Sequence, residues 1–242
     1  MELSLKNIHK YYGKRCIVNR VNLKVEQGEI VGLLGPNGAG KTTTFYITTG
    51  LIMPNEGKVT LDEQDITSLK LSQRAKLGIG YLTQQASIFR NLTVRENIEL
   101  VLEQTNKSLR HRQLRLTELI KEFRLEKVVD TKGSQVSGGE RRRTELARAL
   151  AVGTKGPKFL LLDEPFAGVD PIAVSEIQEI IDDLKNQGMG ILITDHNVRE
   201  TLAITSRSYI MREGQILASG TGSELYKNSL VRKYYLGDNF RV

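Results

Sequence analysis

The chain of 242 residues contains no tryptophan, one cysteine, five prolines and only 6% aromatic residues. A single cysteine, Cys16, cannot form an intramolecular disulfide, which excludes a disulfide-held scaffold. No apolar run approaches the roughly 18 residues of a membrane-spanning helix, because runs such as residues 159–162 soon meet charge. Residues 1–6 also lack the basic-then-apolar order of an export signal. Together these absences predict a cytosolic chain that does not cross a membrane by itself.

What remains is ordinary globular composition, with 39% hydrophobic and 26% charged residues, so the chain is expected to fold into one compact unit with an inserted lobe. Its net charge of +7 fits an acidic partner such as nucleic acid, an anionic lipid surface or a phosphorylated ligand, and does not choose among them. The basic groups at residues 110–115 and 141–143 are explained equally well by solvated helix faces.

Hydrophobic patterns in the N-terminal part predict a run of strands around one helix. Alternation at residues 3–5 and 21–25 predicts two half-exposed strands that pair antiparallel. A nearly continuous apolar run predicts a strand buried on both faces at residues 29–34. A helix is expected over residues 41–49, and a short strand follows at residues 59–61.

The rest of the chain shows first helical and then mixed periodicity. Residues 91–129 have the spacing of long helices, which predicts a helical lobe. Buried strands are expected at residues 159–162 and 190–194, with a helix between them that starts at the N-cap Asp170 and stops at Gly188. A strand, a helix and a strand in this order predict a parallel crossover.

A glycine-rich loop lies between the first buried strand and its helix, and fits the phosphate-binding pattern G-x-x-x-x-G-K-[ST]. Glycines let backbone N–H groups surround phosphate oxygens, and the helix N-terminus favours negative charge. We expect Lys41 to bridge the terminal phosphates, Thr42 to ligate Mg²⁺ and Thr43 to donate to an inner phosphate. The predicted nucleotide-binding residues here are Gly35, Pro36, Asn37, Gly38, Ala39, Gly40, Lys41, Thr42 and Thr43.

Two carboxylates, Asp163 and Glu164, follow the buried strand at residues 159–162, at the sheet edge where ligands of parallel sheets collect. We predict that Asp163 holds Mg²⁺ and that Glu164 orients or deprotonates the attacking water; the alternative is a helix cap or a surface turn. The phosphate loop favours the catalytic interpretation, because both parts then form one nucleotide site.

A third pattern begins at Ser137, which has the spacing of a helix capping box with Glu140. Gly138 and Gly139 leave the first N–H groups of that helix open, so the same helix start could bind a phosphate.

Taken together, these motifs resemble the ATP-binding-cassette (ABC) ATPases in order and approximate spacing, over essentially the whole chain. The resemblance implies an α/β fold, with a P-loop NTPase (RecA-like) core, an N-terminal antiparallel β subdomain and an inserted α-helical subdomain at about residues 86–153, all within one domain over residues 1–242. It implies ATP and Mg²⁺ as ligands. It also implies a homodimer around two ATP molecules, in which Ser137, Gly138 and Gly139 of one copy close over the nucleotide of the other, and integral membrane transporter subunits as partners.

The same resemblance assigns further residues. Tyr12 is placed like the aromatic residue that stacks on adenine, although Tyr11 could serve instead. Gln84 corresponds to a nucleotide and metal ligand, and Asp170 to a dimer-interface residue. His196 corresponds to the switch histidine that contacts the γ-phosphate and helps to hold the water. The predicted catalytic residues are Glu164, His196 and Lys41, and the predicted metal ligands are Thr42, Gln84 and Asp163.

Several stretches resemble more narrowly the ATPase subunits of lipopolysaccharide-export transporters, namely residues 38–46, 86–90, 137–143, 163–170, 194–201 and 235–240. This resemblance implies a position on the cytoplasmic face of the inner membrane, with Phe89 and Arg90 contacting the membrane partner. Two alternatives remain open: an ATPase of a branched-chain amino acid or other solute transporter, and a soluble ABC ATPase that acts on nucleic acid. The last is disfavoured, because the chain has one phosphate loop, one signature and no sustained heptad pattern.

The chain departs from the family pattern in three places. Val136 replaces the usual leucine, and Thr83 replaces a common proline, which would loosen the loop that follows. Residues 152–156 form a longer connection than usual, to which the sequence assigns no function.

Overall fold

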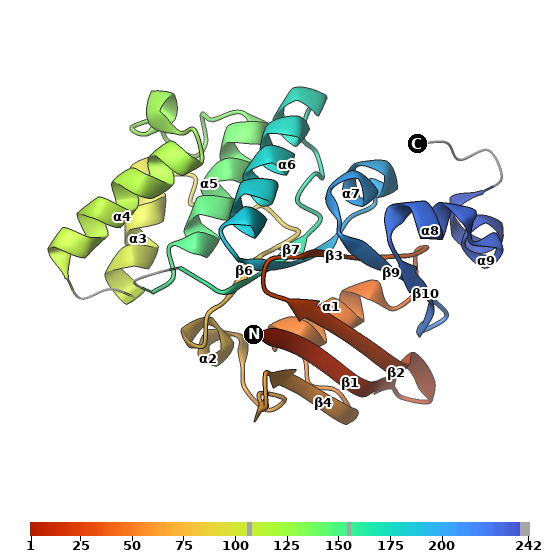
Figure 1. Cartoon of the computed structure of the whole chain (residues 1–242). Helices are drawn as coiled ribbons and strands as arrows, with labels where there is room; N and C mark the ends of the chain where they lie inside the picture. Colours follow the sequence, from red (N-terminus) through yellow and green to blue (C-terminus); the bar gives the residue numbers. More distant parts are fainter. Residues whose placement is uncertain (106–107, 154–155, 238–242) are drawn as a thin grey trace.

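Two β-sheets and the helices around them make up the computed structural model, which describes residues 1–105, 108–153 and 156–237 (Figure 1). The larger sheet contains, in spatial order, β10 (Gln215–Gly220), β9 (Arg207–Arg212), β3 (Ile30–Leu34), β8 (Gly190–Thr194), β7 (Phe159–Asp163) and β6 (Ile79–Leu82). All neighbouring strands in it are parallel except β9 and β10. Strands β3, β7 and β8 are buried along their whole length, as their continuous apolar runs predicted.

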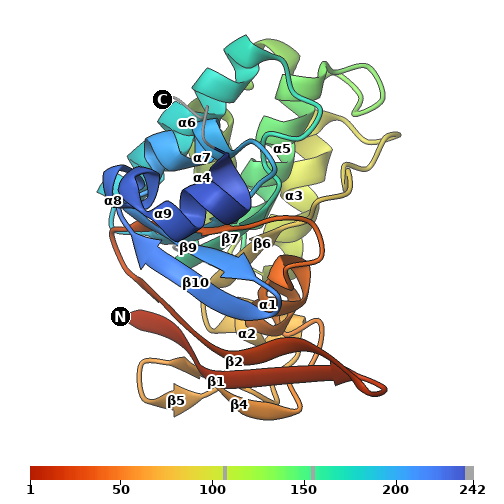
Figure 2. The same ribbon diagram turned by 90° about the vertical axis from the view of Figure 1, so that its right-hand side faces the viewer.

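The smaller sheet is antiparallel and contains β2 (Arg15–Glu26), β1 (Glu2–Tyr12), β4 (Glu56–Leu61) and β5 (Gln64–Asp65). The predicted antiparallel pairing of the first two strands is confirmed. Helix α1 (Lys41–Thr49) lies between the two sheets (Figures 1 and 2), and its Phe45 and Ile47 pack into one apolar cluster with residues of both. One core therefore fixes α1, and the loop before it, against both sheets.

The C-terminal end of α1 is held by Arg74 of α2 (Leu71–Lys76), a side chain with no solvent exposure. Its guanidinium donates to the carbonyls of Ile47 and Thr48, both at 2.8 Å, so it satisfies groups that a helix end leaves unpaired. Burial lowers the pKa of Arg74 to about 10. Gly50 ends α1 in the left-handed region at φ 81°, where the sequence predicted the stop.

Between β6 and β7 the chain forms α3 (Val94–Thr105), α4 (Leu109–Glu122), the short 3₁₀-helix η1 (Glu126–Val128) and α5 (Gly138–Leu150), at the upper left of Figure 1. Their buried Ile98, Leu119 and Leu146 belong to one apolar cluster, which confirms the predicted helical periodicity. A separate helical subdomain with bounds 86–153 stays a prediction. Within the long connection at residues 152–156, Thr154 and Lys155 lie outside the described residues.

Helix α6 (Pro171–Asn186) connects β7 to β8, and Asp170 caps it by accepting from the Ala173 N–H at 3.1 Å, as predicted. The chain after His196, for which the sequence carried no structural expectation, adds α7 (Val198–Ile204), β9 and β10. It then forms α8 (Gly222–Lys227), α9 (Ser229–Val231) and the π-helical turn η2 (Arg232–Leu236). A small apolar cluster that includes Leu34, Leu202 and Leu225 attaches these helices to the end of β3.

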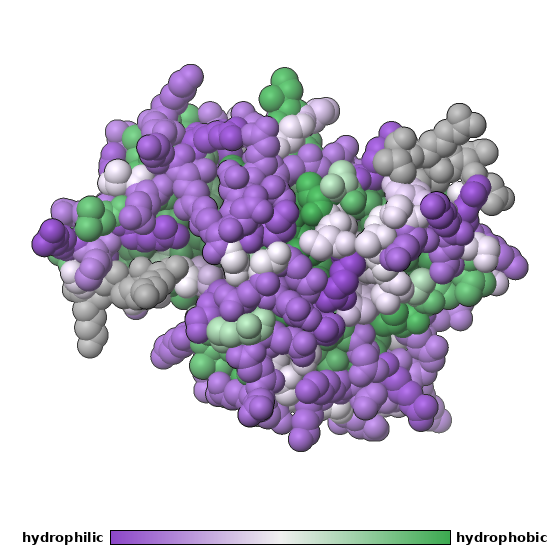
Figure 3. Space-filling view, in the orientation of Figure 1, coloured by the Kyte–Doolittle hydropathy of each residue, from purple (hydrophilic) through white to green (hydrophobic). Residues whose placement is uncertain are grey.

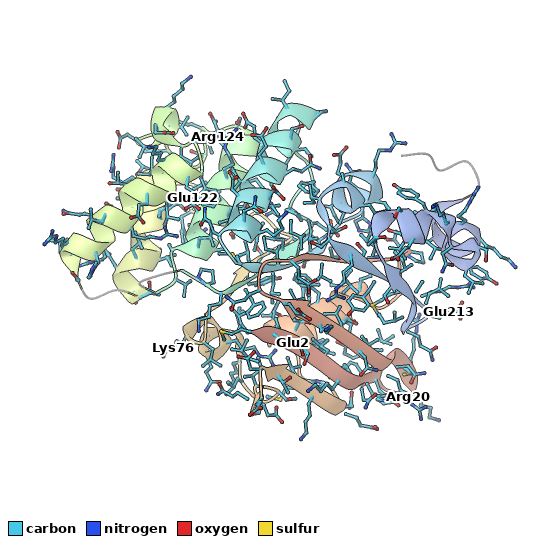
Figure 4. All side chains as sticks on the ribbon, viewed as in Figure 1. Glu2, Arg20, Lys76, Glu122, Arg124 and Glu213 are labelled. Atoms are coloured by element: carbon cyan, nitrogen blue, oxygen red, sulfur yellow. The ribbon has the colours of Figure 1, made fainter. Side chains whose placement is uncertain are left out.

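Hydrophilic residues cover most of the face shown in Figure 3. Charged side chains such as Arg20, Lys76 and Glu213 lie around the outside of the ribbon in Figure 4. Among the described residues, no helix has the length and apolar character needed to span a membrane.

Candidate nucleotide-binding and hydrolysis site

A cavity of about 390 Å³ opens at the edge where β3, β7 and β8 end, the usual ligand position in a parallel sheet. The structure brings together here the phosphate loop, Gln84, both predicted carboxylates and His196. The residues that line the cavity are Arg15, Ile17, Asn37, Gly38, Ala39, Gly40, Lys41, Thr42, Thr43, Gln84, Asp163, Glu164, Thr194 and His196. Arg15, Ile17 and Thr194 were not expected from the sequence.

At two positions of the phosphate loop, the backbone conformation and the close packing accept only glycine. Gly35 has φ 147°, and a Cβ atom there would lie 2.2 Å from the Met211 carbonyl oxygen. Gly40 has φ 98°, and its Cβ would lie 2.7 Å from the Ile17 carbonyl oxygen. Within the described residues, no side chain caps the N-terminus of α1, so the N–H groups of its first turn remain available to an anion.

Lys41 is folded back onto the phosphate loop. Its Nζ donates to the carbonyls of Gly35 at 2.6 Å and Pro36 at 3.1 Å. Burial lowers the pKa of Lys41, and the negative charge of Glu164 opposes that shift. Gly35 and Pro36 therefore hold the ammonium group instead of lining the cavity, and Lys41 brings a positive charge to the point where phosphates would collect.

Asp163 is a buried carboxylate whose Oδ2 atom has no hydrogen-bond partner within the described part of the chain. Burial, followed by the charge of Glu164, raises the pKa of Asp163 to about 6, while Arg142 and the Tyr81 hydroxyl act in the opposite direction. Thr42 and Gln84 supply further oxygens in the same cavity. Hard oxygen donors of this kind fit Mg²⁺.

The described residues contain no group of three His, Cys, Asp or Glu side chains able to hold a metal alone. Phosphate and water oxygens would therefore have to complete a Mg²⁺ shell at Asp163.

Glu164 and His196 both line the cavity and are in direct contact, with 2.9 Å between Glu164 Oε1 and His196 Nε2. Glu164 lies in the left-handed region at φ 50°, and its backbone N–H donates to the Thr194 carbonyl at 2.7 Å. Non-glycine residues rarely adopt this conformation. A carboxylate in this position can accept a proton from water.

Asp195 joins the loops that carry these two residues, although the sequence had not indicated it. This buried carboxylate accepts from the Phe166 N–H at 3.0 Å and from the Asn197 N–H at 2.7 Å. Burial raises the pKa of Asp195, and the two backbone N–H groups oppose that shift. Because Phe166 follows Glu164 and Asn197 follows His196, Asp195 fixes the two loops relative to each other.

The solvated-face interpretation of residues 141–143 is wrong for two of the three arginines, since Arg142 is 5% exposed and Arg143 is 9% exposed. Arg142 turns inward from α5 towards the end of β7. Its guanidinium donates to the carbonyls of Thr83 (2.9 Å), Asp163 (3.0 Å), Glu164 (2.9 Å) and Pro165 (3.2 Å). These hydrogen bonds hold the loop at Thr83 in place, where the sequence predicted a looser loop. The Thr83 hydroxyl also donates to the Gln85 carbonyl at 2.7 Å.

Tyr12 does not line the cavity and is 53% exposed. It pairs with Arg15 in the β1–β2 register, and directly opposed residues of an antiparallel pair project from the same face. Since Arg15 lines the cavity, Tyr12 lies next to its rim, and the adenine-stacking role stays a prediction.

Ser137, Gly138 and Gly139 also lie outside the cavity, at the N-terminus of α5. The predicted capping box is present, because the Ser137 N–H donates to Glu140 at 2.8 Å and the Glu140 N–H to Ser137 Oγ at 3.3 Å. A Cβ on Gly139 would lie 2.5 Å from the Ala173 Cβ, so this glycine allows α5 to approach the start of α6. The signature residues and the α6 cap Asp170 are thus neighbours, away from the cavity of their own chain.

The pKa of Asp163 leads to a prediction for Asp163→Asn in the nucleotide-free protein. Because the folded-state pKa of about 6 exceeds the ordinary value of 3.8, the buried charge destabilises the fold above pH 6, and this penalty disappears as the pH falls towards 4. At pH 7 the substitution should stabilise the protein by about 2 kcal/mol and raise Tm by roughly 5 °C.

Thermal unfolding of both proteins between pH 4 and 8 tests this expectation. The Tm difference should shrink below pH 6, whereas a constant difference would contradict the assignment to this charge.

The fold and the site define an ATP-binding cassette. The chain belongs to the ABC transporter family, because the sequence model of that family matches residues 18–167. This confirms the predicted ABC ATPase class and its α/β fold. Among its relatives are the lipopolysaccharide export system ATP-binding proteins LptB of Haemophilus influenzae, 52% identical over 241 residues, with 99% of each chain covered, and of Acidithiobacillus ferridurans, 50% identical over 240 residues, with 99% of this chain and 98% of the relative covered.

Solved structures resemble the whole fold. The ADP conformation of MJ1267, an ATP-binding cassette of an ABC transporter, has a TM-score of 0.86 at 28% identity, with 98% of this chain and all of the other covered. The dimeric post-hydrolysis state of the ATP-binding cassette MJ0796, bound to ADP and Pi, has a TM-score of 0.78 at 28% identity. The match covers 90% of this chain and 98% of the other.

Proposed function

We propose that this chain is the ATP-hydrolysing subunit of a transporter that exports lipopolysaccharide or a related lipid. It works on the cytoplasmic face of the inner membrane, as a homodimer joined to integral membrane subunits. The observation that carries the proposal is 50–52% identity, over nearly the full length of both chains, to proteins named for lipopolysaccharide export. The nucleotide cavity supports the ATPase part independently of those names.

In the proposed reaction, the phosphate loop and Lys41 bind the triphosphate. Thr42, Gln84 and Asp163 would hold Mg²⁺, which neutralises phosphate charge and orients the phosphate to be transferred. Glu164 accepts the proton of the attacking water, and His196 keeps that carboxylate in position from 2.9 Å away. Arg142 and Asp195 support the backbone on either side of Glu164.

A single copy leaves its nucleotide cavity open on one side, because Ser137, Gly138 and Gly139 lie elsewhere on the same chain. We propose that these residues of a second copy close the cavity, with the N–H groups at the start of α5 directed at the terminal phosphate. ATP then favours the closed dimer because it binds both copies, and hydrolysis removes that preference.

Ser137→Arg tests this geometry. The arginine should leave ATP affinity of the single chain unchanged, because position 137 does not line the cavity. It should prevent ATP-dependent dimerisation, because a long side chain would occupy the space of the other copy's phosphate. Light scattering with ATP measures the association. Ser175→Arg, on the exposed side of α6, is the matched control. Dimerisation of Ser137→Arg at the normal ATP concentration would refute the proposed closure.

A cavity of about 290 Å³ between α2, β6 and α5 supports the position of the membrane partner. Leu71 and Ala75 lie on one side, Arg148 and Val152 on the other, and Ser87 lines it at the start of the segment that carries Phe89 and Arg90. Phe89 is 44% exposed, although the Arg148 guanidinium lies 4.7 Å from the centre of its ring. We propose that a helix of the membrane subunit enters here and contacts Phe89 and Arg90.

The function is tested by purifying tagged Glu164→Gln protein with ATP from gently solubilised membranes of its native cells. The substitution is chosen because it should hold the assembly in its ATP-bound state, and mass spectrometry then identifies the co-purifying proteins. Lipid-export membrane subunits are the expected result. Recovery of solute-permease subunits would support the ATPase assignment but show that the transporter carries a different cargo. Recovery of only nucleic-acid-associated proteins would overturn the transport function.

A further inference from the structure

The guanidinium of Arg142 connects two chain segments beside the nucleotide cavity. Four of its five N–H donors bond carbonyl oxygens: those of Asp163 (3.0 Å), Glu164 (2.9 Å) and Pro165 (3.2 Å) at the end of β7, and that of Thr83 (2.9 Å) after β6. A guanidinium carries its donors in one rigid plane. The two segments therefore keep one relative position for as long as the plane itself is held.

Glu145, one turn further along α5, accepts the fifth donor, with 3.0 Å between Arg142 Nη1 and Glu145 Oε2. Glu145 is 2% exposed, so both charges of this pair are buried. Burial lowers the pKa of Arg142, and the hydrogen bond and charge of Glu145 oppose that shift, followed by the charges of Asp195 and Asp163. Because a buried cation needs a nearby opposite charge, Glu145 stabilises the guanidinium where it stands.

The other oxygen of the Glu145 carboxylate is also occupied. Its Oε1 accepts from the N–H groups of Ser87 at 2.6 Å and Ile88 at 3.1 Å. These two backbone bonds prevent the carboxylate from turning away from Arg142. A carboxylate accepts hydrogen bonds at both oxygens, whereas a glutamine amide accepts at one end and donates at the other. The arrangement therefore requires glutamate at position 145.

Within the described part of the chain, neither Arg142 nor Glu145 lines the nucleotide cavity, so both act on it through the backbone. The backbone they hold carries Glu164 on one side and leads directly into Gln84 on the other. Misplacing a reacting group by about 1 Å lowers a rate by up to about 100-fold. We infer that Glu145 is a positioning residue for ATP hydrolysis, which acts through Arg142 to fix Glu164 relative to Gln84. This inference rests on the proposed function, since it needs Glu164 in its catalytic role.

The test measures kcat and KM for ATP, calorimetric ATP affinity and Tm on full-length chains. Glu145→Gln should lower kcat by about tenfold, because one end of the amide no longer accepts and the guanidinium loses its fixed orientation. ATP affinity should stay within about twofold, since the phosphate loop is untouched. Glu118→Gln is the control, because Glu118 forms an ion pair of the same i,i+3 spacing with Arg115 on the surface of α4. It should leave kcat unchanged.

A double variant, Arg142→Gln with Glu145→Gln, separates positioning from stability. It contains no unpaired buried charge, so its Tm should lie above that of either single variant. Its kcat should nevertheless stay as low as that of Arg142→Gln alone, because both substitutions remove the same rigid connection. Recovery of turnover together with Tm would reduce the pair to a structural role and overturn the inference. Multiplied losses of kcat would also overturn it, since Glu145 would then act independently of Arg142.

The remaining outcomes separate this inference from the proposed function. Normal kcat with Glu145→Gln would overturn the positioning role and leave the ATPase assignment intact, as would an equal loss of ATP affinity and kcat. If Glu145→Gln does not fold, the double variant decides alone: low kcat with normal ATP affinity supports the inference, and normal kcat overturns it. Absence of ATP hydrolysis by the unsubstituted chain would overturn both.

Discussion

Glu164→Gln should reduce ATP turnover about 1,000-fold, the usual contribution of a general base, while ATP affinity stays within about twofold. Glutamine has nearly the same shape and can still face His196 Nε2, which lies 2.9 Å from the carboxylate in the present structure. It cannot take a proton from water. Lys41 and the phosphate loop are untouched, so the substituted chain should accumulate as an ATP-bound dimer. Phosphate release and light scattering on the same sample measure the two effects.

The control for this experiment is Glu213→Gln. Glu213 pairs with Arg212 at the surface and does not line the cavity, and it lies at the outside of the ribbon in Figure 4. This substitution should leave turnover unchanged. Normal turnover by Glu164→Gln would remove Glu164 from the catalytic role and leave His196 or a bound phosphate oxygen as the base.

Lys41→Ala should weaken ATP binding by about 100-fold, or about 3 kcal/mol, which is the loss expected for charge-assisted contacts with phosphate in a buried loop. The loop would also lose the two hydrogen bonds that Lys41 Nζ donates to the carbonyls of Gly35 and Pro36. Adenosine carries no phosphate, so its weak binding should change little. Calorimetric titration with both ligands tells lost phosphate contacts apart from a collapsed cavity.

Lys185→Ala is the matched control, because Lys185 forms a partly buried ion pair with Asp182 on α6 and does not line the cavity. It removes the same charge without touching the cavity, and ATP affinity should remain normal. Equal losses of ATP affinity in the two variants would mean that overall charge, and not the Lys41 contact, attracts the nucleotide.

Several parts of the site could be predicted from the sequence because they depend on neighbours along the chain. The phosphate loop and α1 follow from one run of glycines, a lysine and a buried strand, and the helix bounds agree with the prediction. The caps at Ser137 and Asp170 involve residues three apart, so their spacing alone indicated them. The strand before Asp163 and Glu164 is buried on both faces, which its apolar run already required.

Other functional residues carried no such pattern. Arg142 lay in a basic run that equally fitted a solvated helix face, yet it bonds carbonyls 21 to 59 residues away along the chain. Asp195 reaches back 29 residues to Phe166, and only the parallel pairing of β7 with β8 makes them neighbours. Arg15 entered the cavity through the β1–β2 hairpin, whose register a sequence pattern does not specify.

The sequence by itself determined the family, the order of the elements and the position of the phosphate loop, because these depend on short-range spacing and on hydrophobic periodicity. The tertiary structure alone decided which polar groups are buried and what they hold. It turned Arg142 towards the end of β7, joined the loops that carry Glu164 and His196 through Asp195 and directed Asn97 at the backbone of Phe89. The physical reason is that a buried polar side chain must find its hydrogen-bond partners in space, and chain distance does not limit where those partners lie.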